Sequence, residues 1–226
     1  MRFGMILIAL GFVLIQLGLF GKGPRPDLLW LGFDFTALGV AHLLGASALY
    51  GKRRDGTIPW WSWIVFLPLF LITHAVWHLF RLLARDAKAN DVSEELTVGR
   101  RQRAGELEGD FANYVDLTAE FSAPLPIREA PSYLNFPILD GGTPSTRELR
   151  AFIRSLRPGR TFVHCAQGRG RAGLFAVAML LHSKAATSVE EALRILRSAR
   201  PGVRLNRNQR RCAETFAREL RVQKLE

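Results

Sequence analysis

The distribution of charge along the chain limits what it can fold into more than any other feature. Residues 3–20 carry no charged side chain and are just long enough to cross a lipid bilayer as a helix. Most of the Trp, Phe and Leu residues lie before residue 84, whereas residues 88–226 carry 23 Lys/Arg and 16 Asp/Glu. We therefore predict a membrane region at 1–88 and a separate domain at 89–226 that is large enough to bury its own core.

Three apolar segments in the first region predict about three transmembrane helices: residues 3–20, Leu28–Tyr50 and about Ile58–Phe80. The first segment also resembles a secretory signal, but no small-x-small cleavage motif follows Phe20, so we expect an uncleaved helix. The third segment has Trp residues near both ends, as an aromatic belt requires. Asp34 and His42 interrupt the second segment. They either mark a functional pathway or have structural roles, and we favour Asp34 near an interface and His42 packed between helices.

Three spans place the two termini on opposite sides of the membrane. The count of basic residues hardly decides the orientation, because a cytosolic C-terminus puts five Lys/Arg inside and leaves four outside. The chain has only two cysteines, which do not form a disulfide framework. We expect an integral membrane protein whose C-terminal domain is cytoplasmic, because a cysteine thiol stays reduced in that compartment. Arg81, Arg85 and Lys88 share one helical face that is suited to anionic headgroups.

The C-terminal domain alternates strand and helix signals after a polar segment at 89–110, which we interpret as a linker or an irregular entry to the domain. Short strands are predicted at 114–117, 133–138 and 161–164. Helices are predicted at 145–156 and 171–184, from Ser188 to before Pro201, and from Asn206 onward; Ser188 with Glu191 has a capping-box pattern. This alternation indicates an α/β domain with a central sheet flanked by helices.

The segment from Thr161 to Gly173 carries the chemistry. A strand rich in β-branched and aromatic residues runs into a glycine-containing loop, which runs into a helix. Such a loop can point consecutive backbone N–H groups at one anion, and the N-terminal end of the helix adds positive potential. Cys165 lies where this field favours a thiolate. Arg171 can fold back and hold two phosphate oxygens. The alternative, an ordinary buried cysteine, fits Cys212 better than Cys165.

The pattern His164-Cys165-x-x-Gly168-x-Gly170-Arg171 resembles the signature of the protein tyrosine and dual-specificity phosphatase superfamily. Three flanking segments are also similar to segments of small dual-specificity phosphatases: residues 115–121, the acid-loop-like residues 136–140, and residues 200–209 with the approach to the final helix. The resemblance covers roughly residues 95–226. The membrane region lies outside it.

The resemblance implies that Cys165 attacks phosphorus and forms a phosphocysteine intermediate. It assigns phosphate binding to Arg171 and to the loop amides, from Ala166, Gln167, Gly168, Arg169, Gly170 and Arg171. Asp140 would be the general acid and then the base, in a Gly-Gly-Thr-Pro loop free to swing over the site. The alternative for Asp140 is a turn-forming role, with Asp116 and Glu120 in reserve as acids. His164 would order the loop. No metal and no cofactor are implied.

Three functions remain open from the sequence. The first is a phosphatase acting on phosphoprotein. The second is a lipid-phosphate phosphatase (phosphoinositide or phosphatidylglycerophosphate-like), which the membrane region and the loop cation Arg169 favour. The third is a membrane-docked, phosphate-binding pseudoenzyme, against which the intact Cys165, Arg171 and Asp140 argue. The net charge of +11 suits phosphate-bearing partners. The chain has no zinc-finger spacing and no aromatic-interleaved basic repeat, so nucleic acid is not predicted as a partner.

Overall fold

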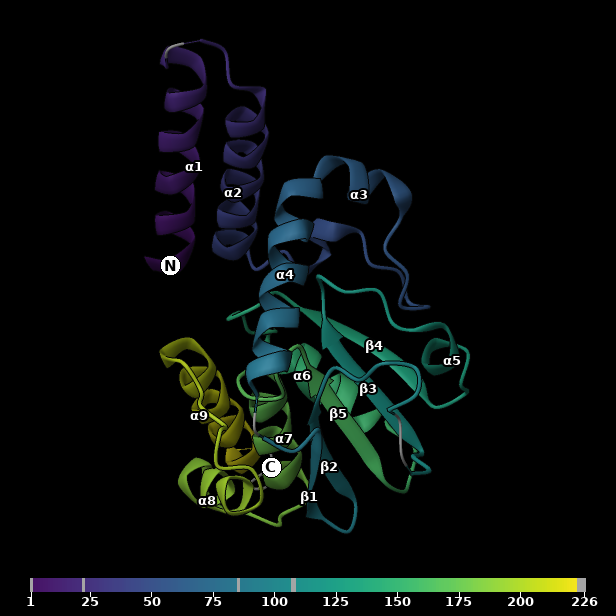
Figure 1. The fold of residues 1–226 in the computed structure, drawn as a ribbon. Helices are drawn as coiled ribbons and strands as arrows, with labels where there is room; N and C mark the ends of the chain where they lie inside the picture. The colour runs from purple at the N-terminus through teal and green to yellow at the C-terminus, as the bar shows by residue number, and fades with distance from the viewer. Residues whose placement is uncertain (1, 22, 85, 107–108, 223–226) are drawn as a thin grey trace. The chain divides into compact units, whose positions relative to one another are not determined.

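The computed structural model describes residues 2–21, 23–84, 86–106 and 109–222 (Figure 1). It divides into two compact units. The first comprises Met1–Arg53, Thr57–Ala84 and Ala119–Ser122; the second comprises Arg54–Gly56, Arg85–Thr118 and Ala123–Glu226.

The first unit is helical. Its elements are α1 (Arg2–Phe20), α2 (Pro26–Leu44), a 3₁₀ turn η1 (Ser47–Tyr50), α3 (Trp60–Val65) and α4 (Leu67–Leu83). By length and apolar composition, two described helices could cross a membrane, over Phe3–Phe20 and Pro26–Leu44. Soluble core helices and signal sequences can pass the same test, but only 22% of each of these windows is buried. The predicted second span ends early, because Gly45 adopts a left-handed conformation (φ 67°) that caps α2.

Glycines spaced seven residues apart bring α1 and α2 together as an antiparallel pair (Figure 1). A Cβ on Gly11 would lie 2.6 Å from the carbonyl oxygen of Gly32, and a Cβ on Gly39 would lie 2.6 Å from that of Gly4. Side chains at these positions would therefore push the two backbones apart. Small residues that allow such an approach are typical of helix pairs in membranes, where close packing replaces the hydrophobic driving force.

The predicted third span is not one continuous helix. The chain leaves helical geometry at Phe66 (φ −106°, ψ 25°), and α4 begins at Leu67 with Pro68 in its first turn. A proline has no N–H to donate and its ring excludes a preceding helical turn, so α3 and α4 are separate. At 17 residues, α4 is shorter than the two candidate spans.

Two side chains of α2 satisfy the backbone groups that this break exposes. The Trp30 indole N–H donates to the carbonyl oxygen of Val65 (2.7 Å), and the Asp34 Oδ2 accepts from the N–H of Leu69 (3.1 Å). Asp34 is completely buried within the unit, and its place near a membrane interface stays a prediction. It lies inside the unit because the first turn of α4 needs an acceptor there. The His42 ring packs edge-on against Phe3 of α1, between helices as predicted.

The second unit contains one sheet. Among the described residues its strands are β1 (Ala89–Ser93), β2 (Leu96–Arg100), β3 (Asn113–Thr118), β4 (Tyr133–Ile138) and β5 (Thr161–Cys165), in the order β1-β2-β5-β3-β4. Only the β1–β2 pair is antiparallel. The linker predicted at 89–110 is therefore wrong in its first half. Leu96–Gly99 is buried, because β2 pairs with the central β5, whereas polar residues dominate β1 at the sheet edge.

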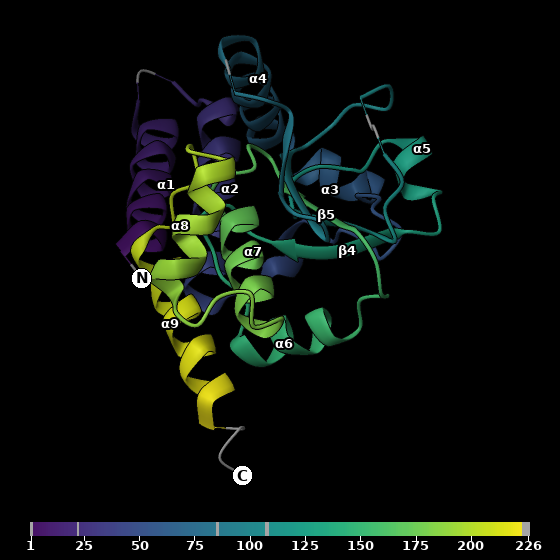
Figure 2. The same ribbon diagram turned by 90° about the horizontal axis from the view of Figure 1, so that it is seen from below.

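Helices cover the sheet. They are α5 (Leu125–Arg128), α6 (Thr146–Arg154), α7 (Arg171–His182), α8 (Val189–Ala199) and α9 (Arg207–Val222). α7 is almost wholly buried, because it packs against β5 while α6, α8 and α9 pack against it (Figure 2). Ser145 and Glu148 form a complete capping box on α6. On α8 only half of the expected box forms, because the Glu191 carboxylate accepts from Thr187 instead of Ser188. The predicted α/β class, a sheet flanked by helices, is confirmed.

Gly11→Leu is expected to lower the thermal stability of the first unit, because overpacking of this kind costs about 1–3 kcal/mol. All five Trp residues lie between positions 30 and 77, so tryptophan fluorescence during heating in detergent reports on this unit alone. Phe12→Leu is the matched control, since Phe12 is 56% exposed on the same helix. Equal unfolding midpoints for the two variants would contradict the close packing of α1 on α2.

Candidate active site

The phosphate loop, residues 165–171, joins two buried elements. β5 ends at Cys165, and every residue of this strand is buried. α7 begins at Arg171. The predicted strand, loop and helix are therefore all present, and the loop is fixed at both ends by the core.

Gly168 determines the shape of the phosphate loop. Its φ is +66°, in the left-handed region that other residues rarely adopt. A Cβ there would contact the Gly99 carbonyl oxygen and lie 2.8 Å from the Arg100 nitrogen. The loop therefore runs directly against the end of β2, and only glycine fits at this point.

The first two carbonyl groups of the phosphate loop accept a backbone hydrogen bond from the residue that follows β2. The N–H of Arg101 donates to the carbonyl oxygens of Cys165 (2.8 Å) and Ala166 (3.4 Å). In a trans peptide the next residue's N–H points opposite to the carbonyl. The N–H groups of Ala166 and Gln167 consequently point away from β2, which is the orientation that an anion cradle requires.

Arg171 brings the end of β4 to the phosphate loop. Its side chain is 1% exposed, Nη1 donates to the carbonyl oxygen of Ile138 (2.9 Å), and Nη2 contacts Asp140 Oδ1 (3.0 Å). Cys165, at the other end of the loop, is 3% exposed. The structure thus gathers the predicted nucleophile, guanidinium and acid around one loop.

The segment that carries Asp140, which we expected to swing over the site, makes hydrogen bonds with the start of α9. Asn206 donates from Nδ2 to the carbonyl oxygen of Gly141 (2.8 Å), and Gln209 donates from Nε2 to that of Gly142 (3.4 Å). These two residues also cap α9 reciprocally, which fixes their side chains. The sequence signalled the cap through its Asn-x-x-Gln spacing but did not indicate the contacts to the acid segment. The Asp140 side chain itself is 85% exposed, although it pairs with Arg171.

The two reserve acids are placed differently from Asp140. Asp116 is buried, and it accepts hydrogen bonds from the Thr118 N–H and hydroxyl and from the Tyr133 hydroxyl. Burial and the Asp116 charge raise the pKa of Tyr133, so this donor stays protonated. Glu120 belongs to the first unit, where its carboxylate accepts from the Ala119 N–H. Asp116 is therefore a structural acceptor.

His164 lies beneath the phosphate loop. It is 3% exposed, its Nε2 is 3.6 Å from Asp116 Oδ1, and its ring packs against Tyr114 at 5.1 Å. This packing suits the ordering role that we predicted for His164. Ala172 is fully buried in the first turn of α7.

Arg169 and Cys212 have environments unlike those of Arg171 and Cys165. Arg169 pairs with Asp86 at 2.6 Å, with both side chains about half exposed, and this hydrogen bond lowers the pKa of Asp86. Burial raises the pKa of Cys212 to about 11, so this thiol stays neutral at physiological pH. It contacts the carbonyl oxygen of Pro144 at 3.6 Å, which suits a packing role.

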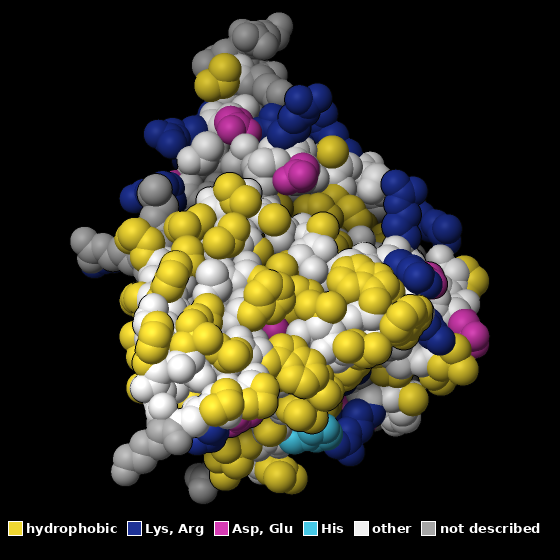
Figure 3. Space-filling model, turned by 90° about the horizontal axis from the view of Figure 1, so that it is seen from above, with side chains coloured by type: hydrophobic (Ala, Val, Ile, Leu, Met, Phe, Trp, Pro, Cys, Tyr) yellow, Lys and Arg dark blue, Asp and Glu magenta, His cyan; other side chains and the backbone are white. Residues whose placement is uncertain are grey.

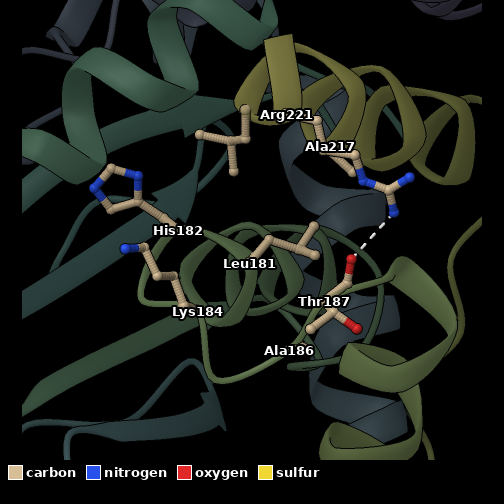
Figure 4. A pocket seen from close by; sticks show the side chains of 8 residues that line it. Leu181, His182, Lys184, Ala186, Thr187, Ala217 and Arg221 are labelled. Carbon is tan, nitrogen blue, oxygen red and sulfur yellow. Dashed lines mark hydrogen bonds between the residues drawn. The ribbon is translucent and has the colours of Figure 1, made fainter. Parts of the chain in front are cut away.

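A separate hollow of about 240 Å³ lies at the other end of α7 (Figure 4). Its lining residues are Leu181, His182, Lys184, Ala186, Thr187, Ala217, Leu220 and Arg221. Because α7 has 12 residues, the hollow lies about 18 Å along the helix from the phosphate loop. It has no part in the chemistry of Cys165. Among the described residues, no group of three or more His, Cys, Asp or Glu side chains could hold a metal ion.

Comparisons with known proteins point to one family. Residues 117–222 match the family model "PTP-SAK: Swiss Army Knife protein, DSP-PTPase phosphatase domain". Protein 067L of Invertebrate iridescent virus 3, which is named as a predicted tyrosine phosphatase, is 36% identical over 72 residues. That alignment covers 27% of this chain and 30% of the viral protein, so it spans less than a third of that relative.

Solved structures share the fold of the second unit. A glycine-to-alanine mutant of Tk-PTP is 25% identical with a TM-score of 0.53, covering 60% of this chain and 97% of that one. Human DUSP28 is 20% identical with a TM-score of 0.51, covering 59% and 99%. PTPMT1 in complex with PI(5)P is 13% identical with a TM-score of 0.54, covering 61% and 99%. The last two likenesses show the fold alone.

Gly168→Ala is expected to weaken the binding of inorganic phosphate at least tenfold, because the new methyl group forces the loop away from β2. A left-handed φ at a non-glycine residue adds about 1–2 kcal/mol. Titration calorimetry of the folded chain measures this affinity. Gly105→Ala is the control, since a Cβ there meets nothing within 4 Å. Unchanged phosphate affinity in the Gly168 variant would show that the loop does not form the anion site.

Proposed function

We propose that the C-terminal domain, which matches the DSP-PTPase phosphatase-domain family model over residues 117–222, hydrolyses phosphomonoesters through a phosphocysteine intermediate on Cys165. One observation carries the proposal. The buried Arg171 guanidinium lies at the end of the loop that Cys165 begins, and it contacts Asp140 at 3.0 Å. A nucleophile, a phosphate-binding cation and an acid thus surround one loop of backbone amides.

In the first step, the Cys165 thiolate attacks phosphorus and the bond from phosphorus to the leaving oxygen breaks. Protonated Asp140 gives its proton to that oxygen, so the leaving group departs as a neutral alcohol or phenol. The loop amides from Ala166 to Arg171 and the Arg171 guanidinium stabilise the charge on the phosphoryl oxygens.

In the second step, water attacks the phosphocysteine while the Asp140 carboxylate takes a proton from that water. The sulfur–phosphorus bond breaks, and Cys165 leaves as a thiolate. The products are inorganic phosphate and the regenerated site. Asp140 holds Arg171 Nη2 in the free chain, so the substrate phosphate takes its place on the guanidinium and releases Asp140 toward the leaving group.

Residues 1–88 are proposed to form the membrane region, with the catalytic domain at 89–226 on the cytoplasmic side, where Cys165 stays reduced. The exposed apolar side chains support this anchoring. Among the described residues, all the exposed large hydrophobic residues except Leu125 and Val222 lie within residues 3–83, and Figure 3 shows such side chains crowded over one face. A water-soluble monomer rarely exposes so large an apolar surface.

Phosphoprotein is the proposed substrate class, and an anionic phospholipid is the second candidate. One observation favours the lipid. Only two residues separate Leu83, the last residue of α4, from Asp86, which pairs with Arg169 in the phosphate loop. A membrane-anchored α4 would therefore tether Asp86 to the bilayer through only two residues. The PTPMT1 complex with PI(5)P shares the fold of this domain.

Cys165→Ser is expected to abolish turnover of an aryl phosphate, because a hydroxyl is a far weaker nucleophile than a thiolate. Inorganic phosphate should still bind, since the loop amides and Arg171 remain. Cys212→Ser is the matched control and should keep nearly full activity. Steady-state release of the phenol measures both rates. A Cys165 variant that retains activity would overturn the mechanism, and a parent chain that binds phosphate without turnover would support the pseudoenzyme alternative.

The substrate class is tested by parallel assays on a phosphotyrosine peptide and on vesicles of a phosphorylated, anionic phospholipid. If phosphoprotein is the substrate, kcat/KM for the peptide should exceed that for the vesicles at least tenfold. If the lipid is the substrate, the preference reverses, and activity should fall as salt screens the headgroups. A salt-sensitive preference for vesicles would replace the first assignment with the second.

A further inference from the structure

Arg200, which follows α8, makes its contacts with the back of the phosphate loop. Its side chain is buried, with 3% of the residue exposed. Nε donates to the carbonyl oxygen of Gly168 (2.8 Å), and Nη2 donates to that of Gln167 (3.3 Å). One planar guanidinium therefore holds two consecutive carbonyl groups of the loop.

The directions of these two carbonyl groups fix the directions of the N–H groups in the same two peptides. The N–H of Gly168 is opposite the carbonyl of Gln167, and the N–H of Arg169 is opposite the carbonyl of Gly168. Arg101 fixes the two preceding peptides in the same way. We propose that Arg200 is a positioning residue, which keeps the second half of the amide cradle aimed at the substrate phosphate.

The same guanidinium reaches the segment that leads into β1. Nη1 donates to the carbonyl oxygen of Ala87 (3.1 Å) and to Oδ1 of Asn90 (2.7 Å). Asp86, next to Ala87, pairs with Arg169 in the loop itself. Residues 86–90 therefore hold the phosphate loop through two arginines. Through these contacts the segment becomes a structural part of the proposed catalytic site.

The charge of Arg200 also acts on the site. Burial lowers the pKa of Arg200, and the nearby Asp86 and Cys165 oppose that effect, whereas Arg169 and Arg100 add to it. An arginine stays protonated under these conditions. The Arg200 charge therefore interacts with Cys165, in addition to holding the loop.

The inference rests on the proposed function, but three of its readouts need no turnover. Arg200→Gln is compared with Arg200→Lys and with the control Arg197→Gln. Arg197 also donates to a backbone carbonyl, that of Val203, yet it does not contact the loop. For each variant we measure the affinity for inorganic phosphate, the pH at which iodoacetamide alkylation of Cys165 reaches half its plateau rate, kcat and KM for an aryl phosphate, and the thermal midpoint.

Arg200→Gln should weaken phosphate binding at least tenfold, raise the half-plateau pH of alkylation and lower kcat/KM. Arg200→Lys should recover the alkylation pH, because its charge remains, but only part of the phosphate affinity, because an ammonium cannot reproduce the planar fork. Arg197→Gln should stay within twofold of the parent. If Arg200→Gln changes only the thermal midpoint, or if Arg197→Gln matches it in every readout, Arg200 is not a positioning residue.

Asn90→Ala keeps the test decisive if the Arg200 variants do not fold. It removes a single acceptor from Nη1 and should weaken phosphate binding two- to fivefold, whereas an unchanged affinity would overturn the proposal. The two claims can fail separately. A parent chain that binds phosphate but hydrolyses no phosphomonoester contradicts the proposed function and leaves the positioning test intact.

Discussion

The close approach of the phosphate loop to the end of β2 is the constraint on which the active site depends. Gly168 lies so near Gly99 and Arg100 that no side chain fits there. With the loop pressed against β2, Arg101 can hold the first carbonyls and Arg200 the next two. Peptide geometry then turns the N–H groups the other way. The cradle is thus formed by contacts behind the loop, and its position at the start of α7 adds the positive end of that helix.

The first unit follows a different rule, in which backbone groups and small residues matter more than apolar burial. Glycines at seven-residue spacing let α1 and α2 touch along their backbones. Where Pro68 interrupts the next helix, Trp30 and Asp34 of α2 supply the missing hydrogen bonds. A buried peptide N–H or C=O group without a hydrogen-bond partner costs several kcal/mol of free energy. The buried carboxylate of Asp34 is accounted for by this need.

The sequence predicted those elements whose patterns are local. The strand at 133–138 and the strand–loop–helix around Cys165 were predicted nearly to the residue, because glycine, β-branched residues and the capping residues act over a few positions. β1 and β2 were missed because charged residues surround their short apolar run. Pro68 could have predicted the break at Phe66, but the segment was interpreted from its apolar composition as one continuous helix. The contacts of Arg200 join residues 32 or more positions apart, and no local pattern indicates them.

The central claim is covalent catalysis by Cys165, and detection of the intermediate tests it most directly. The chain is mixed with an aryl phosphate, quenched in acid within the first turnover, digested and analysed by mass spectrometry. The account predicts one phosphoryl group on the peptide that contains Cys165 and none on the peptide that contains Cys212. An unmodified Cys165 peptide in a sample that releases phenol and phosphate at its full rate would contradict it.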